Sequence, residues 1–230
     1  MNRLISIELR KNKINKYVTG SIGCCLFNFI CFYIFAFSAS EEVIFNSYES
    51  LVKISAGVNI VLFMCVSAVM YSEFIVNEYS GNKLILMFSY PINRRKWMIT
   101  KIGIVSIFTA ISAFISEILI WSIYFMIEKF FPILNGHISN DILSGAILTS
   151  ILSIIIIMFG GFIALEIGMY FKTASSTIIS SIIVGAIVAN IIIMTVNYGY
   201  TGFIGITILM VIIGFIIINK ILNKVDLMEI

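Results

Sequence analysis

Residues 142–171 read ILSGAILTSILSIIIIMFGGFIALEIGMYF, a stretch in which Glu166 is the sole charged residue. A helix needs about 20 mostly apolar residues to cross the hydrocarbon core of a bilayer. The stretch lacks the alternation of apolar and polar residues that marks an outer-membrane strand, so it predicts a transmembrane helix. Because it is longer than one crossing requires, we expect this helix to tilt or to project from the bilayer.

Five other windows share this apolar character. The composition agrees, since 60% of the chain is hydrophobic and 12% is charged, whereas an average soluble domain is about 25% charged. These values exclude a soluble globular protein and a disordered chain. We therefore predict an all-α polytopic membrane protein with a single domain over residues 1–230. Its spans are expected at about 17–39, 51–72, 102–125, 142–171, 176–196 and 200–219.

The distribution of lysine and arginine predicts the orientation of the chain. Of the 15 lysine and arginine residues, all but Lys53 and Lys129 fall in residues 1–16, in residues 73–101, at Lys172 or in the C-terminal tail. These segments lie on one side of a six-span topology, and the positive-inside rule makes that side cytoplasmic. Both termini are then cytoplasmic. The net charge of +3 does not call for a nucleic acid, because the basic residues face the anionic lipids of the inner leaflet.

Few residues are available for metal or redox chemistry. Cys24, Cys25 and Cys31 lie in the first span and Cys65 lies in the second, with no C-x-x-C spacing, and His137 is the single histidine. We expect no disulfide framework and no metal site. The phosphate-loop motif G-x-x-x-x-G-K-[ST] and the metalloprotease motif H-E-x-x-H are absent from the sequence, so we expect no catalytic residue in this chain.

Two cytoplasmic segments carry further patterns. Residues 1–16 mix apolar and basic side chains, which is typical of a helix lying in the membrane interface, although a plain basic flank has the same composition. Residues 73–101 form the long cytoplasmic connection. Within it, Leu84 and Phe88 stand one turn apart and predict a short helix with an apolar face, which ends before Pro91. Such a helix is suited to docking on a cytoplasmic partner.

The same connection carries a recognisable motif. Glu78-x-x-Gly81, an apolar helix, Pro91-x-x-Arg94 and Lys101 at the opening of a span together resemble the motif of the ATP-binding-cassette (ABC) type-2 permeases. That family also has six spans, cytoplasmic termini, an N-terminal interfacial helix and a long cytoplasmic connection after the second span. The resemblance therefore extends over nearly the whole chain in layout.

The resemblance implies the membrane subunit of a transporter. ATP and Mg would be bound by a separate cytoplasmic ATPase subunit, with no cofactor in this chain, and residues 77–91 would form the coupling helix that receives the movement of that subunit. Glu78 and Arg94 would contact the ATPase subunit or each other, unless both are simply solvated. Asn82 stands where the family usually has threonine, a departure of little chemical weight.

The resemblance also implies a setting and a cargo. Permeases of this type pair with a second permease subunit, identical or different, in the bacterial plasma membrane. Short members resemble exporters of peptide toxins and permeases that clear lantibiotics or bacitracin-like peptides from the producing cell. We therefore expect a hydrophobic or amphipathic substrate and a role in export or antimicrobial-peptide immunity.

Two glutamates fall inside predicted spans. A carboxylate at the bilayer centre costs about 2.5–3.5 kcal/mol, so neither Glu117 nor Glu166 is expected to face lipid. They would line a translocation pathway or a subunit interface. Alternatively, they would be structural partners of hydroxyls such as Ser112 or Ser116, or protonated donors between helices. An alternative function uses both acids, in an ion- or proton-coupled secondary transporter.

A row of small residues marks the fifth span. Ser181, Gly185 and Ala189 recur every fourth residue and form a smooth face that allows close helix approach. We expect this face to pack within the chain, with a dimer contact as the alternative.

Overall fold

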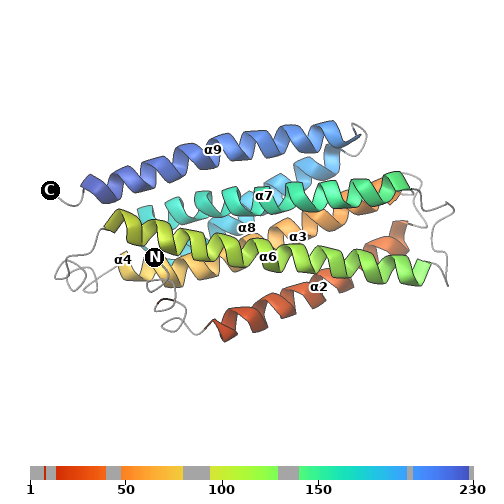
Figure 1. The fold of residues 1–230 in the computed structure, drawn as a ribbon, viewed down its shortest axis with the longest axis horizontal. Helices are drawn as coiled ribbons and strands as arrows, with labels where there is room; N and C mark the ends of the chain where they lie inside the picture. Colours follow the sequence, from red (N-terminus) through yellow and green to blue (C-terminus); the bar gives the residue numbers. More distant parts are fainter. Residues whose placement is uncertain are drawn as a thin grey trace.

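The fold consists of long helices that run together as a bundle (Figure 1). A computed structural model of the chain describes Glu8 and residues 14–39, 48–79, 94–128, 140–195 and 199–227. The long helices are α2 (Asn15–Ala39), α3 (Tyr48–Tyr71), α6 (Arg94–Glu128), α7 (Asn140–Phe171), α8 (Ala174–Met194) and α9 (Gly199–Leu227). These 6 helices are long and apolar enough to cross a membrane. The predicted all-α fold with six candidate spans is confirmed.

Helix α3 lies at the centre of the bundle. It packs against α8, α7, α2 and α6, and 67% of its most apolar window is buried, compared with 22% for α2 and for α9. Figure 1 shows α2 and α9 at opposite edges of the bundle, and α2 begins at the same end at which α9 finishes. Any movement of α3 therefore requires most of the other helices to move or to repack.

The outward faces of the helices are apolar and the interior contains polar side chains. Large exposed isoleucine, leucine and phenylalanine side chains occur along α2, α6, α7, α8 and α9, while asparagine, serine, threonine and charged residues are among the buried groups. In water, exposed apolar surface of this extent would be unfavourable. In a bilayer the lipid tails cover it, so the interior polar groups become the informative part of the structure.

The second span continues past its predicted end at residue 72. A π-helical turn, η1 (Ser72–Val76), and a final turn, α4 (Asn77–Tyr79), extend α3, and the Asn77 N–H donates to the Ser72 carbonyl five residues earlier. Turns of this kind are rare and are frequently found at functional sites. The extension carries Glu73 and Glu78 on helical backbone to one end of the bundle.

The third span likewise begins earlier than predicted, because α6 starts at Arg94. Residues 80–93 then lie between the two helices. They are outside the described residues, as are residues 1–7 and 9–13 of the predicted interfacial helix.

The small-residue face of α8 packs against α3. A Cβ atom placed on Gly185 would lie 3.3 Å from the Cα atom of Val61, and one placed on Gly57 would lie 3.5 Å from the Cβ atom of Ala189. Ser181 completes this face and is buried in the same contact region. The face therefore serves packing within the chain, as expected from its sequence.

Candidate functional site

A buried lysine lies beside the predicted coupling segment. Lys101, in the second turn of α6, has no exposed surface. Its ammonium group donates to the Phe74 carbonyl oxygen at 2.6 Å and forms an ion pair with the Glu78 carboxylate. The Glu8 carboxylate lies 3.6 Å away, and the centroid of the Trp97 ring lies 3.6 Å from Nζ. We call these five residues the Lys101 cluster.

Local structure explains how the cluster forms. Trp97 and Lys101 are four residues apart on α6, so the indole lies one turn before the lysine and stacks its face on the ammonium group. Phe74 and Glu78 are also four residues apart, one in the π-helical turn and one in α4, and they present a carbonyl and a carboxylate to the same point.

The Lys101 cluster ties together the helix ends that flank residues 80–93. Glu78 precedes this segment and Lys101 follows it, so the ion pair bridges the two ends. The partners compensate the desolvation of the buried ammonium group. Removing one partner of a buried ion pair costs about 3–5 kcal/mol, since the remaining charge is left without compensation. The two ends are therefore expected to move as one body.

A second ion pair joins α2 to the same end of the bundle. The Lys16 ammonium and the Tyr17 hydroxyl both donate to Glu73, at 3.0 Å and 2.5 Å. Glu73 lies in the π-helical turn, next to Phe74 of the Lys101 cluster. The start of α2, the end of the second span and the start of α6 thus meet around this turn.

Polar groups from four helices, α2, α3, α6 and α7, come together around Glu117 in the middle of the bundle. Glu117 is 1% exposed, and its polar neighbours are Asn59 of α3 and Ser150 of α7. Asn59 accepts a hydrogen bond from the Asn28 side chain of α2 at 3.2 Å and donates to the Ala113 carbonyl oxygen of α6 at 3.4 Å. Among the described residues, neither carboxyl oxygen of Glu117 completes a hydrogen bond of normal geometry.

The expected protein-lined environment of Glu117 is thus present, but its neighbours differ from the hydroxyls considered from the sequence. Ser116 is buried without a hydrogen-bond partner within the described part of the chain, and Ser150 comes from a different helix. A carboxyl group between four helices can join them through polar contacts.

Glu166 lies in a different environment. Its carboxylate forms an ion pair with Lys220 of α9 at 2.5 Å, and its side chain is 25% exposed. Glu166 belongs to the last turns of α7, whereas Glu117 lies well inside α6. The structure therefore does not bring the two glutamates together.

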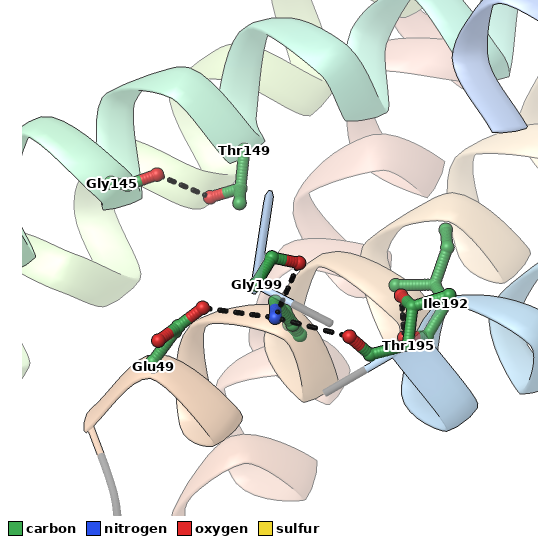
Figure 2. Close-up of polar contacts among 7 residues, drawn as sticks. Glu49, Gly145, Thr149, Ile192, Thr195 and Gly199 are labelled. Carbon is green, nitrogen blue, oxygen red and sulfur yellow. Dashed lines mark hydrogen bonds and ion pairs between the residues drawn. The ribbon is translucent and has the colours of Figure 1, made fainter. Parts of the chain in front are cut away.

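At the opposite end of the bundle, Lys53 is also fully buried. Its ammonium group donates to Glu49 at 3.0 Å, to the Thr195 carbonyl oxygen at 3.4 Å and to the Gly199 carbonyl oxygen at 2.9 Å (Figure 2). Gly199 has a φ of +60°, a conformation that favours glycine. Lys53 of α3 therefore holds the ends of α8 and α9 around their connection.

The predicted site residues fall into two groups. Glu78, Glu117 and Glu166 have the contacts given above, and Arg94 is the first residue of α6, although its side chain is outside the described part of the chain. The remaining predicted residues, which are Gly81, Leu84, Phe88 and Pro91, lie outside the described residues.

Sequence reasoning missed the buried roles of several residues. Nothing in the sequence predicted the buried contacts of Trp97, Asn28 and Asn59, except that each is a polar or aromatic residue in or beside an apolar run. Lys53 could have been recognised from Glu49 one turn earlier, because that spacing forms helical ion pairs. Within the described ranges, no group of three or more His, Cys, Asp or Glu residues could hold a metal ion.

The comparisons with known proteins agree with this architecture. The profile of the family described as "ABC-2 family transporter protein" matches residues 4–142, which is more than half of the chain. An uncharacterized protein of Bacillus subtilis (strain 168), YcbO, is 25% identical over 193 residues, covering 81% of this chain and 83% of that protein. No solved structure matches.

The family match extends from the N-terminal segment to the start of α7 and includes the whole Lys101 cluster. Membrane subunits of this family are non-catalytic and in general associate with an ABC ATPase subunit. The chain belongs to the ABC-2 transporter family and is a multi-pass membrane component of such a transporter.

Proposed function

We propose that this chain is the permease subunit of an exporter in which residues 77–91 couple ATP hydrolysis to the movement of the helices. A separate cytoplasmic subunit binds ATP and Mg and presses on the apolar face that the sequence predicts from Leu84 and Phe88. The observation that carries this proposal is the Lys101 cluster, because it joins both ends of the segment to the helix bundle.

The path of the movement follows from the packing. Glu78 stands at the end of the extended second span, and α3, which begins that span, is the most buried helix of the bundle. Lys101 links the same point to α6, while Glu73 links it to α2 through Lys16. A displacement of the coupling segment is thereby transmitted to three helices at once. Ion pairs join the helices at this point directly, so little of the displacement is absorbed by flexible loops.

The proposed orientation places the Lys101 cluster, both termini and the ATPase subunit on the cytoplasmic side of a bacterial plasma membrane. The bias of lysine and arginine toward this end supports it. A second permease subunit, identical or different, completes the transporter, because α2, α6 and α9 present broad apolar faces that a second copy or lipid can cover.

The proposed substrate is a hydrophobic or amphipathic peptide, exported as a toxin or removed as an antimicrobial agent. The short connections at the outer end support this proposal: α2 ends at Ala39 and α3 begins at Tyr48, while α6 ends at Glu128 and α7 begins at Asn140. Such connections leave no room for an external capture domain. A substrate that enters from the membrane or from the cytoplasm is compatible with them.

The test is a pull-down of candidate ATPase subunits with the co-expressed permease, followed by measurement of ATPase activity and of peptide export in proteoliposomes. Phe88→Ala should weaken association or uncouple hydrolysis from export, and it should leave membrane insertion intact. The matched control is Ile187→Ala, which removes an exposed apolar side chain of α8, 54% exposed, on a helix outside the faces named above. Normal assembly and export with Phe88→Ala would contradict the docking role of the segment.

A further inference from the structure

A groove opens between the last turns of α7 and α9, with a volume of about 820 Å³. Its floor is apolar, since Met169 and Ile221 are 9% and 3% exposed. Apolar atoms form most of the lining surface, and polar groups are interspersed among them. The polar lining residues are Glu166, Tyr170, Asn219, Lys220, Asn223 and Lys224.

The groove lies where the long apolar run of α9 ends. Helix α9 carries no charged residue from Gly199 to Asn219, and Lys220 is the first after this apolar run. Lys220 and Lys224 are four residues apart and so lie on one face of the helix, above Ile216. The same face therefore offers an apolar part at membrane depth and two ammonium groups at the level of lipid phosphates.

The electrostatics of the groove favour an anion. Two lysines face one carboxylate, and that carboxylate, Glu166, is paired with Lys220 at 2.5 Å. The lysine side chain in this pair is 71% exposed. Exposed ion pairs contribute little free energy, because water screens them and the long side chain is restrained. Lys220 can therefore exchange Glu166 for a phosphate, and Lys224 is available beside it.

We propose that this groove binds an anionic phospholipid of the inner leaflet, with its headgroup phosphate between Lys220 and Lys224 and an acyl chain along Ile216 and Met169. The asparagine amides of the rim supply further donors to the phosphodiester and glycerol oxygens. The volume suits a headgroup with the upper part of a chain, since small-molecule sites span about 300–1,000 Å³. The proposal rests on the orientation proposed above, which places this end of the bundle at the cytoplasmic leaflet.

The test titrates the purified full chain in detergent with dioctanoyl phosphatidylglycerol, with dioctanoyl phosphatidylcholine and with inorganic phosphate, and it measures bound lipid by native mass spectrometry. Phosphatidylglycerol should bind more tightly than phosphatidylcholine. Lys224→Gln should weaken its binding by about fivefold, the value of one lysine near a lipid surface. The matched control is Lys172→Gln, which removes an exposed lysine at the same end of the bundle but outside the groove.

A second variant separates the groove from a general surface attraction. Glu166→Gln should tighten phosphatidylglycerol binding, because it releases Lys220, and thermal unfolding checks that the variant is folded. Equal losses with Lys224→Gln and Lys172→Gln, or weaker binding with Glu166→Gln, would overturn the proposal. Displacement of the lipid by millimolar inorganic phosphate would assign the site to a free anion instead. None of these readouts uses the ATPase subunit, so failure here is distinct from failure of the coupling proposal.

Discussion

Replacement of Lys101 by methionine tests the central contact of the proposed coupling mechanism. Methionine keeps most of the length and apolar volume of the side chain but removes the charge that faces Glu78 and Glu8. Glu78 and Glu8 then lose the ammonium group that both contact, and the Phe74 carbonyl loses its donor. Breaking a buried pair in this way costs about 3–5 kcal/mol.

The magnitude can be observed as a thermal shift. For a protein of this length, 1 kcal/mol corresponds to about 2–4 °C in the unfolding midpoint, so we expect a decrease of roughly 10 °C in detergent solution. Lys172→Met is the matched control, because it makes the same change at an exposed position directly after α7. Surface substitutions usually stay within about 0.5 kcal/mol, and the control should scarcely move the midpoint.

A double-mutant cycle assigns the effect to the pair. Glu78→Gln should be milder than Lys101→Met, because the lysine keeps the Phe74 carbonyl, the Trp97 ring and the nearby Glu8. If the two residues interact, the double variant should be less destabilised than the sum of the single variants, since each single change already removes their mutual attraction. An unfolding midpoint for Lys101→Met equal to that of the wild type would refute this account of the buried ion pair.

Three other predictions follow from the bundle. In a cysteine-free background, an impermeant thiol reagent added outside the cell should label Ser47→Cys and not Ser89→Cys, and the reverse pattern would overturn the proposed orientation. Glu117→Gln should retain export because an amide can contact Asn59, whereas Glu117→Leu should impair it, since leaving a buried polar group unpaired costs about 1–3 kcal/mol. Export by Glu117→Gln should depend on ATP and persist when the proton gradient is collapsed. A secondary carrier would be favoured if this variant lost export and if the proton gradient alone drove transport by the wild-type protein. Lys53→Met should increase hydrogen exchange and proteolysis near the α8–α9 connection, because it removes the donor to the Thr195 and Gly199 carbonyl oxygens. Unchanged protection would show that these hydrogen bonds are not needed to hold the connection.

Much of the fold was predictable because a bilayer imposes simple requirements on a sequence. Each span must supply about 20 apolar residues, and this length is visible in a window such as residues 142–171. The packing role of the small-residue face of α8 could also be predicted from the sequence, since Gly185 and Ala189 permit a close helix approach that larger side chains prevent. The motif that includes Glu78 and Lys101 likewise pointed to the family, because its charged residues, glycine and proline all fall within one short segment of the chain.

The pairing of the polar residues was decided by the tertiary structure. The sequence alone determined that Glu166 lay in an apolar run, but its partner, Lys220, is on another helix, and Asn28 meets Asn59 in the same way. The extended π-helical end of the second span, which brings Glu78 to Lys101, was also invisible to hydropathy. The physical reason is that hydropathy reports the transfer of each segment into lipid, whereas partners inside the bilayer depend on how the helices rotate and pack against one another.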